Sequence, residues 1–516
     1  MGIDINMLRA EKGGNPDLVR ESERRRYRKE DQNYVDQAID LDEKWRKKQF
    51  EFEQSAKEIN RIQKAVGELK KGGKDATAEI AELEALKTKR NATEKEADEL
   101  VLLRDKALNK IGNIVHESVF THDDEEHNPI VRKWGEIPDI KVDSTPGRCA
   151  HHQVLAMIDG YDPKRGQKIA GHRGYFLKGM GALLNMALVN YGMHFLSKKE
   201  YTVLQTPFFM KKSIMAETCQ LSDFDDQLYK VSTGKEEEDN EFYLIATSEQ
   251  PISAFFYKES VEAKELPMRF CGYSSCFRKE AGAHGRDNLG IFRIHQFEKI
   301  EQFTITEAED SWKEHERMIN ISEEFYKSLK LPYRVVNIVS GALNDAAAKK
   351  YDLEAWFPSY NAFRELVSCS NCTDFQSRGL EVKTFGAKKE EEACEAKECE
   401  NCEKKEETCE KKDETCEKKD ETCEKKEEKA SKDKKEKKEG KKEDVRLVHM
   451  LNGTLCATER TLCCILENYQ TETGVKVPEV LIPYVGTDFI PYVKPVPEIE
   501  KKDEKKKDEK KKEETK

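Results

Sequence analysis

The sequence has no long apolar run and no start of the secretory kind. No stretch of its 516 residues approaches about 18 consecutive apolar residues, so we expect no transmembrane helix. The segment from Met1 to Asn6 has no basic region followed by an apolar one, which argues against a signal peptide. Asn6 also stands where a myristoylation motif needs Ser or Thr. We therefore expect a soluble, intracellular protein without a membrane partner.

The sequence also lacks the cysteine spacing of a small secreted domain. Nine of its 15 cysteines are scattered through core-like sequence, and without a signal we interpret them as reduced thiols. The others lie in a block of lysine and glutamate repeats over residues 387–443, where Cys402, Cys409, Cys416 and Cys423 are seven apart. Such spacing cannot bring four thiolates to one ion unless the segment folds back, so we favour a solvated low-complexity insertion between two strands over a metal site. We expect no tightly bound zinc.

The net charge of −11 is unusual for a protein that binds a polyanion. Charged residues make up 37% of the chain, however, and nucleic-acid binding depends on local patches rather than on the average. One basic patch lies near the start of the chain. Its predicted nucleic-acid contacts are Arg24, Arg25, Arg26 and Arg28.

Two long helices are predicted in the N-terminal part, over residues 28–70 and 75–115. Apolar residues recur in both with the a/d spacing of a seven-residue repeat, and a turn follows from the breaker sequence Lys71–Lys74. Two antiparallel helices of about 40 residues make a rod of roughly 60 Å at about 1.5 Å per residue. A rod this long has little core of its own. It is either a coiled coil that dimerises or an arm that projects to touch a large ligand.

The chain from residue 174 onward has the pattern of an α+β domain. Residues 177–196 have helical periodicity and lead into a strand that ends at Pro207, a residue that suits an edge or a bend because it has no N–H donor. An antiparallel sheet is predicted by alternating β-branched and aromatic stretches at 242–246, 269–277, 291–305 and 334–340. The tail from Glu498 is almost all lysine, glutamate and aspartate, and we interpret it as disordered.

Two arginine-bearing segments carry the strongest functional signal. In the first, Arg278 and Glu280 are two apart on a predicted strand, so they should point to one face. A glycine-rich loop follows, and Phe297 comes at its far end. This set suits a nucleotide, with arginine on phosphate, glutamate on an amine or a metal, and phenylalanine under the base. The second segment places Arg460 at the start of a predicted helix, whose N-terminal dipole also favours phosphate.

A resemblance to a known family rests on five segments that come in the right order. Cys276–Phe297 and Asn452–Leu466 resemble motifs 2 and 3 of the class II aminoacyl-tRNA synthetases, and their residues are similar to the seryl-tRNA synthetases of the eukaryotic cytosolic type. Tyr201–Phe209 resembles motif 1, and Ala246–Gln250 and Phe363–Asn371 add to the match. The resemblance fails only in the lysine/glutamate block and the tail. It implies an α+β fold with a class II antiparallel sheet flanked by helices, an antiparallel two-helix coiled-coil arm that touches tRNA, and a cytoplasmic homodimer.

The resemblance further implies a reaction in two steps. ATP and L-serine give seryl-adenylate and pyrophosphate, and the seryl group then moves to tRNA(Ser), with tRNA(Sec) as a second acceptor to test. ATP with Mg²⁺ would be the cofactor. Negative charge grows on phosphate oxygens in the first step, so catalysis should rest on positioning and electrostatic stabilisation. Arg278 would hold the α-phosphate and Arg460 the γ-phosphate end. Glu280 would hold the adenine amine, and Phe297 would stack on the ring.

The resemblance assigns site residues to four groups. The predicted catalytic residues are Arg278, Glu280 and Arg460. The predicted ATP-binding residues are Arg278, Lys279, Glu280, Ile294, His295, Gln296, Phe297, Glu365, Leu366, Val367, Ser368 and Arg460. The predicted serine-binding residues are Thr247, Glu249, Arg278, Glu301, Asn452 and Thr454. The predicted Mg²⁺ contacts, made together with ATP, are Glu365 and Ser368.

The predicted domains follow the same reading of the chain. They are a tRNA-binding helical arm domain (1–120), a linker (121–173), a catalytic domain (174–495) that contains the insertion, and a charged tail (496–516). Glu459 precedes the arginine of motif 3, where the resemblance to the eukaryotic seryl-tRNA synthetases implies a threonine; other class II synthetases have Glu-Arg there, so we expect activity to survive. Two alternatives stay open: a paralogue that makes an adenylate but charges no tRNA, and a coiled-coil RNA-binding scaffold with an inactive synthetase domain. The intact arm argues against the first, and the intact arginine segments argue against the second.

Overall fold

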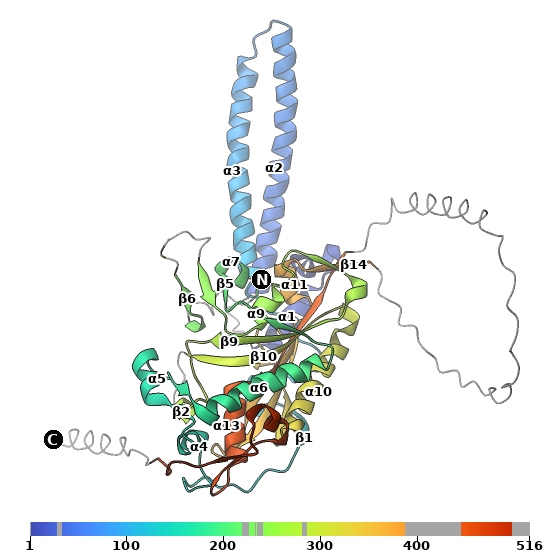
Figure 1. Cartoon of the computed structure of the whole chain (residues 1–516). Helices are drawn as coiled ribbons and strands as arrows, with labels where there is room; N and C mark the ends of the chain where they lie inside the picture. Colours follow the sequence, from blue (N-terminus) through green and yellow to red (C-terminus); the bar gives the residue numbers. More distant parts are fainter. Residues whose placement is uncertain are drawn as a thin grey trace, which may run out of the picture.

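The molecule consists of a large mixed sheet with packed helices and a long helical arm that projects from it (Figure 1). The structure is a computed structural model, and it describes residues 2–27, 33–218, 226–232, 234, 241–280, 286–386 and 445–497. Among these residues, no helix is both long enough and apolar enough to cross a membrane.

The arm is formed by α2 (Tyr34–Lys71) and α3 (Thr77–Leu108), which lie side by side, so the predicted antiparallel two-helix arm is confirmed. Ile59, Ile62 and Leu83 form a small buried cluster toward its tip. The second helix ends at Leu108, earlier than the predicted residue 115, because the chain turns there into the body. The side-chain amide of Asn113 then donates to the carbonyl oxygens of Ala346 at 2.9 Å and Cys372 at 2.8 Å.

The base of the arm shares a hydrophobic core with the body. Val19 of α1 (Pro16–Arg25), Val35 of α2 and Leu108 of α3 pack together with Phe375 of α11 (Phe375–Leu380). Since α11 follows most of the main-sheet strands in the sequence, the arm is packed onto the body at its root rather than tethered by a free linker.

The main sheet has the order β1-β11-β12-β13-β16-β10-β9-β4. All its neighbouring strands are antiparallel except β4 and β9, which run parallel. Of the strands in this sheet, β16 comes last in the sequence, but it lies between β13 and β10. The bounds are β1 Ile130–Trp134, β4 Thr202–Gln205, β9 Met268–Phe277, β10 Gln296–Thr306, β11 Tyr333–Asn337, β12 Lys349–Phe357, β13 Ala362–Asn371 and β16 His449–Ala457.

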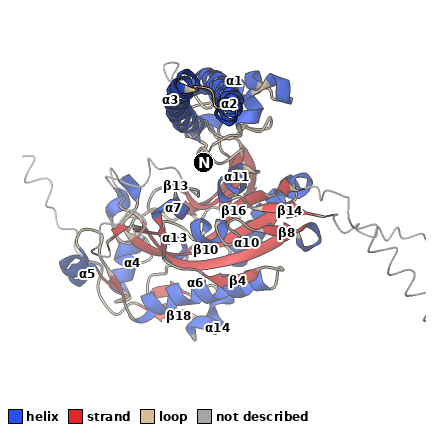
Figure 2. Cartoon of the chain, turned by 90° about the horizontal axis from the view of Figure 1, so that it is seen from above, coloured by secondary structure: helices blue, strands red, loops and turns tan. Residues whose placement is uncertain are grey.

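Four helices share the main core with this sheet: α4 (His151–Met157), α6 (Gly179–Ser197), α10 (Ser311–Ser328) and α13 (Thr458–Asn468). Figure 2 shows α6 running along the sheet beside β10 and β4. Along β16, Leu451 and Leu455 enter this core, whereas Asn452 and Thr454 point to the opposite face of the sheet. The predicted α+β class is confirmed.

The segment 121–173, predicted as a linker, contributes elements to the body. It contains β1, α4 (His151–Met157), β2 (Tyr161–Asp162) and α5 (Pro163–Ala170), and β1 forms one edge of the main sheet. β1 could not be predicted from apolar alternation, because most of its side chains are exposed.

Short strands and helices complete the body. Small sheets are formed by β5 (Phe209–Lys211), β7 (Phe242–Leu244) and β6 (Lys230–Val231), by β2 and β3 (Phe176–Leu177), by β17 (Gly474–Lys476) and β18 (Phe489–Pro491), and by β15 (Arg446–Leu447), β14 (Lys383–Phe385) and β8 (Ser260–Glu262). Short helices are α7 (Lys212–Met215), α9 (Glu249–Ser253) and α14 (Ile482–Val485). The predicted insertion lies almost entirely in 387–444, outside the described residues, and the charged tail from Glu498 also lies outside them.

Candidate active site

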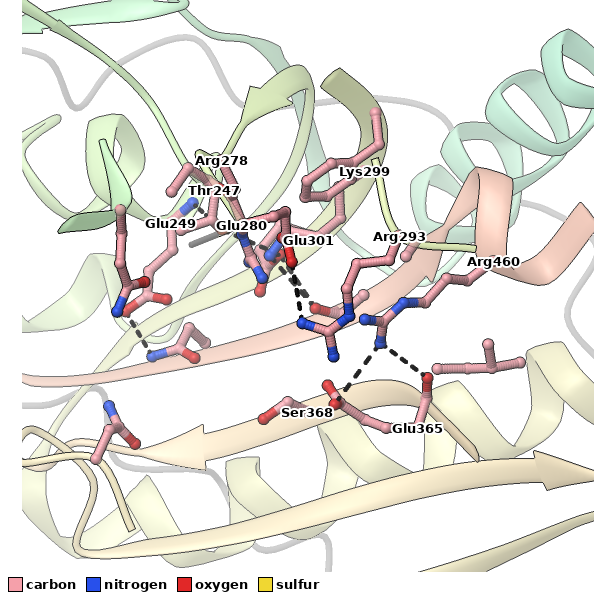
Figure 3. A pocket seen from close by; sticks show the side chains of 18 of the residues that line it. Thr247, Glu249, Arg278, Glu280, Arg293, Lys299, Glu301, Glu365, Ser368 and Arg460 are labelled. Carbon is pink, nitrogen blue, oxygen red and sulfur yellow. Dashed lines mark hydrogen bonds and ion pairs between the residues drawn. The ribbon is translucent and has the colours of Figure 1, made fainter. Parts of the chain in front are cut away.

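A cavity of about 650 Å³ lies on the main sheet where β13, β16 and β10 are neighbours (Figure 3). Its lining brings together segments that are far apart in the sequence and that were predicted to form one site. Phe297, Lys299 and Glu301 of β10 face the cavity, whereas Ile300 between them lies in the core. The predicted site residues that line it are Thr247, Glu249, Arg278, Glu280, Ile294, Phe297, Glu301, Glu365, Leu366, Ser368, Asn452, Thr454 and Arg460.

Each of the two key arginines is held by a carbonyl oxygen and an aromatic ring. Arg278 follows the last residue of β9; its guanidinium lies 5.2 Å from the Phe297 ring, and its Nε donates to the Ala246 carbonyl at 3.4 Å. Arg460 lies in the first turn of α13, as predicted, 5.0 Å from the ring of Phe292. Both guanidiniums are therefore oriented before any ligand arrives, which favours bidentate binding of two phosphate oxygens by each planar guanidinium.

The prediction that Arg278 and Glu280 share one face of a strand is wrong. The strand β9 ends at Phe277, and Glu280 has a φ of 50°. Both side chains still line the cavity. Glu280 accepts a hydrogen bond from Nη1 of Arg293 at 2.9 Å, so its carboxylate is fixed by the loop rather than by strand geometry.

A buried acceptor group lies on the floor of the cavity around Glu301. This residue is 1% exposed and lies opposite Thr454 in the register of β10 and β16. Its Oε2 accepts from the hydroxyls of Thr454 at 3.4 Å and Thr247 at 3.5 Å. Lys299 forms an ion pair with the same carboxylate. Hydroxyls, a carboxylate and an ammonium thus meet in one small, water-poor place, which suits a small zwitterion.

A second acceptor group is centred on Glu249, at the start of α9. Its Oε1 accepts from the amides of Asn452 at 3.0 Å and Gln376 at 2.8 Å. Burial, together with the nearby charge of Glu301, raises the pKa of Glu249 to about 7. The group is therefore poised between its neutral and charged forms near physiological pH, and a cation in the cavity would favour the charged form.

Glu365 and Ser368 lie together on β13, at the edge of the cavity below Arg460 (Figure 3). Burial works against the charge of Glu365, but the cations Arg460 and Lys350 outweigh it and lower the pKa of this carboxyl. Although surrounding protein disfavours the charge, the side chain is 49% exposed, so a ligand in the cavity can reach it. A charged carboxylate beside a hydroxyl is an oxygen donor set that fits Mg²⁺, which commonly takes its remaining ligands from water and phosphate.

Four predicted ATP-binding residues do not line the cavity. Val367 is fully buried in the core, and Gln296 is exposed at the start of β10. The ring of His295 lies against the carbonyl oxygen of Arg278, with Nδ1 at 3.0 Å, so it supports the loop. Lys279 donates through its backbone N–H to the carbonyl of Gln227. The prediction assigned runs of consecutive residues to ATP. Successive side chains of an extended chain point to opposite sides, so some of these residues point away from the cavity.

The cavity contains cations that the sequence interpretation missed: Arg293, Lys299 and Lys350. Lys299 could have been found, since it lies between Phe297 and Glu301 on the same face of a predicted strand. Arg293 could also have been found, because it belongs to the segment that resembles motif 2. Lys350 lies on β12, a strand with no recognised motif, and only the sheet order brings it near.

Glu459, which precedes Arg460 in the first turn of α13, is 1% exposed and lies against the start of β10. Its carboxyl accepts from the backbone N–H of Glu298 at 3.0 Å and from the hydroxyl of Tyr175 at 3.2 Å. Burial and the neighbouring Glu298 raise the pKa of Glu459 well above its ordinary value. It therefore acts as a neutral structural group that joins motif 3 to motif 2.

The basic patch near the start of the chain divides into different environments. Arg24 is on the surface, where it pairs with Glu21 at 2.6 Å. Arg25 turns inward and donates to the carbonyl of Val119 at 2.7 Å. Arg26 is 5% exposed and donates to several backbone carbonyls, so its position gives it a structural role in place of the predicted tRNA contact. Arg28 lies outside the described residues.

Comparison with known proteins identifies the family. A model described as the seryl-tRNA synthetase N-terminal domain matches residues 3–115, and one described as the tRNA synthetase class II core domain (G, H, P, S and T) matches residues 229–398. The cytoplasmic serine–tRNA ligase of Dictyostelium discoideum is 49% identical over 498 residues, which are 96% of this chain and 97% of that protein. The chain belongs to the seryl-tRNA synthetase family.

Two solved structures of seryl-tRNA synthetases have the same fold as this chain. The cytoplasmic serine–tRNA ligase of Naegleria fowleri, in complex with AMP, is 44% identical with a TM-score of 0.73, over 96% of this chain and 100% of that one. The seryl-tRNA synthetase of Pyrococcus horikoshii, complexed with ATP, is 33% identical with a TM-score of 0.76, over 95% and 100%. The predicted family and the class II fold with its helical arm are therefore confirmed.

Proposed function

We propose that the protein activates L-serine with ATP to seryl-adenylate and transfers the seryl group to tRNA(Ser). One observation carries the proposal. Two oriented arginines and the buried acceptor group around Glu301 line the same cavity in a member of the seryl-tRNA synthetase family. The first set suits a polyphosphate and the second a small zwitterion. An adenylating enzyme needs both within reach of each other.

Arg278 and Arg460 divide the triphosphate between them. Arg278 holds the α-phosphate, where negative charge grows during attack by the serine carboxylate, and Arg460 holds the γ end. The ring of Phe297 supports the adenine, and Glu280, fixed by Arg293, accepts from its amine. No covalent intermediate with the protein is needed. The arginines are oriented in advance, so little reorganisation is required when the charge develops.

Serine binds between the two acceptor groups. Its ammonium is held by the carboxylates of Glu301 and Glu249 and by the hydroxyl of Thr247. Its own hydroxyl is held by Asn452 and Thr454. Alanine leaves these buried polar groups without a partner, so the pocket rejects it more strongly than a sieve based on size would.

We infer that ATP enters with Mg²⁺ and that Glu365 and Ser368 hold the ion at the phosphate side of the cavity. The ion, when bound, neutralises phosphate charge and helps orient the pyrophosphate leaving group. Glu365 keeps its carboxylate charged beside Arg460, and the Arg460 guanidinium donates to the Glu365 carbonyl at 3.3 Å. This contact holds the Arg460 guanidinium at a fixed distance from Glu365, the proposed Mg²⁺ ligand.

We infer a division of labour along the chain, with tRNA bound by the domain 1–120 and both chemical steps in 174–495. Among the predicted arginines, Arg24 is exposed and suits a phosphate contact.

We also infer a homodimer. Large apolar side chains are exposed along α6 and the edge strand β4, at Leu183, Met186 and Val203, and a second copy would cover them. Relatives named as cytoplasmic ligases support a cytoplasmic location.

The proposal is tested by ATP–pyrophosphate exchange with each amino acid, followed by aminoacylation of a total tRNA pool. We expect exchange with serine and with no other amino acid. Absence of exchange with serine would refute the proposed enzyme activity. Exchange without any charging would favour the paralogue that makes an adenylate only. Sequencing of the charged pool then shows whether tRNA(Sec) accompanies tRNA(Ser).

The role of the arm is tested by shortening it above its base. Lys48 of α2 and Glu96 of α3 form an ion pair at 2.8 Å, so a short glycine turn can join them after removal of residues 49–95. The small core at the arm base stays intact. Exchange should persist in this variant while tRNA charging collapses. Charging at the full rate would show that the outer arm does not bind tRNA.

A further inference from the structure

His151 lies beneath the loop that connects β9 to β10, outside the recognised motifs. It is 2% exposed and begins α4. Its Nδ1 lies 2.9 Å from Oε1 of Glu467 in α13, and its Nε2 lies 3.2 Å from the carbonyl oxygen of Leu289 in the loop. Both neighbours are acceptors. The ring can donate to both only when each nitrogen carries a proton, that is, as an imidazolium.

The buried partner Glu467 is equipped to stay charged. Besides the ring, it accepts from the backbone N–H of His151 at 3.0 Å, and from the hydroxyl and backbone N–H of Ser359 at 2.7 Å and 2.9 Å. Burial opposes its charge, but these contacts lower the pKa of Glu467. A buried carboxylate with this many donors and one cation is a stable ion pair.

The charges around the ring agree with the imidazolium form. Burial opposes the charge of the ring, whereas the neighbouring Cys463 and Glu467 favour it, so the pKa of His151 is raised. Burial raises the pKa of the Cys463 thiol, so Glu467 is the anion of the group. Burial and the charge of His151 lower the pKa of the adjacent His152 to about 4, which leaves that ring neutral.

The contact with the loop lies directly before residues that form the cavity. Leu289 is followed by Gly290, whose φ is +68° and whose Cβ, if present, would come within 2.4 Å of Nε2 of His151. The next four residues, Ile291–Ile294, all line the cavity. The carbonyl of one of them, Phe292, accepts from Nε of Arg460 at 3.4 Å. His151 thus holds the loop at the point where it begins to form the ATP site.

We propose that His151, held as an imidazolium by Glu467, is a positioning residue that fixes the loop segment 287–295 in its ATP-binding conformation. This rests on the proposed function of the cavity. His151 is not among the residues that line the cavity, so it acts through the loop. It also ties that loop to α13, the helix that carries Arg460, and so keeps the two arginine segments in a fixed relation.

The main test replaces the cation while keeping a side chain of similar reach. In His151→Gln, the affinity for Mg²⁺-ATP measured by calorimetry and the KM for ATP in exchange should weaken about tenfold, the effect of losing one hydrogen bond to a charged group. The KM for serine should stay unchanged. The matched control is His315→Gln: His315 is 1% exposed and contacts one carbonyl, of Cys369, at 3.0 Å. It should lower thermal stability without a change in ATP affinity.

A second variant approaches the same contact from the loop. Gly290→Ala should weaken ATP binding, and in the double variant with His151→Gln the two effects should not add, since both remove one contact. Histidine ring ¹⁵N spectra at pH 8 should show a doubly protonated ring that is missing in His151→Gln. A neutral ring, or unchanged ATP affinity, or an equal loss for ATP and serine would overturn the proposal. Absence of serine exchange in the wild type would instead refute the proposed function, because calorimetry tests ATP binding independently.

Discussion

The guanidinium of Arg26 donates to the carbonyl oxygen of Ala347 at 2.8 Å, across 321 residues of sequence. The same group donates to the carbonyl of Asn113 at 2.8 Å, which follows α3. It also contacts the carbonyls of Leu343 and Asn344, two residues that line the cavity. One buried cation therefore joins the root of the arm to a wall of the candidate active site.

Loss of this cation should destabilise the protein. In Arg26→Ala several buried carbonyls lose their donor, and we expect the free energy of unfolding to fall by about 2–4 kcal/mol. The matched control is Arg24→Ala, two residues earlier on the surface of α1, which should change the free energy of unfolding by less than about 0.5 kcal/mol. Urea denaturation of both variants measures the difference. Equal stability of the two would show that the buried contacts contribute nothing.

The arginine of motif 3 should be needed for chemistry rather than for folding. In Arg460→Ala, the rate of serine-dependent exchange should fall by about 10²–10³, since a preorganised charge at the polyphosphate is lost. Arg334→Ala is a suitable control, because Arg334 has a similar exposure and also packs on an aromatic ring but lies outside the cavity. Exchange by the control should stay near the wild-type rate. A similar loss in both variants would contradict the role of Arg460.

The binding of serine should improve as the pH rises through neutrality. The pKa of Glu249 is raised to about 7, mainly by burial, and only its charged form pairs with the serine ammonium. The KM for serine should therefore fall by about tenfold between pH 6 and pH 8, as the ionised fraction rises from about one-tenth to nine-tenths. In Glu249→Gln the KM should be higher and almost independent of pH. A wild-type KM that is flat over this range would contradict the assignment.

Glu459 should make stability depend on pH in the opposite sense to an ordinary surface carboxylate. Its pKa is raised in the folded state, mainly by burial, so the folded protein holds this proton more tightly than the unfolded chain does. Stability from this group is full below about pH 4.5 and is lost as the pH rises toward the folded pKa, by up to about 1.4 kcal/mol per pH unit. Glu459→Gln stays neutral. Its Tm relative to wild type should therefore increase from pH 5 to pH 8, and a constant difference would show that Glu459 is ionised when buried.

The lysine/glutamate block should be dispensable for adenylation. On either side of it, β14 and β15 already pair, with Lys383 opposite Leu447 and Thr384 opposite Arg446. A direct join from Gly386 to Val445 should preserve this pairing, and we expect serine-dependent exchange at the wild-type rate. A large loss of exchange in this deletion would reveal a role for the block in the catalytic body. Removal of the tail from Glu498 serves as the control for lost charge.

The sequence revealed those parts of the molecule in which local pattern and three-dimensional position agree. The heptad spacing predicted the arm, and Arg278, Glu301 and Arg460 were assigned to one site from their motifs before the sheet order was known. Other features depend on packing between distant segments. Arg26 looks like its neighbour Arg24 in a basic run, and only contact with Ala347 takes it into the interior. Glutamate is usually exposed, yet contacts with Glu298 at the start of β10 and with Tyr175 hold Glu459 in the interior.

The central position of β16 bears on how the protein is made. This strand contributes Asn452 and Thr454 to the cavity and leads to Arg460, but it leaves the ribosome after all its neighbours in the sheet. A nascent chain that has emerged as far as Gly386 contains β13 and β10 without the strand that separates them. It can fold the arm early, whereas the central pairings must wait for distant residues. An unfinished or prematurely terminated chain would therefore carry a complete arm and no working active site.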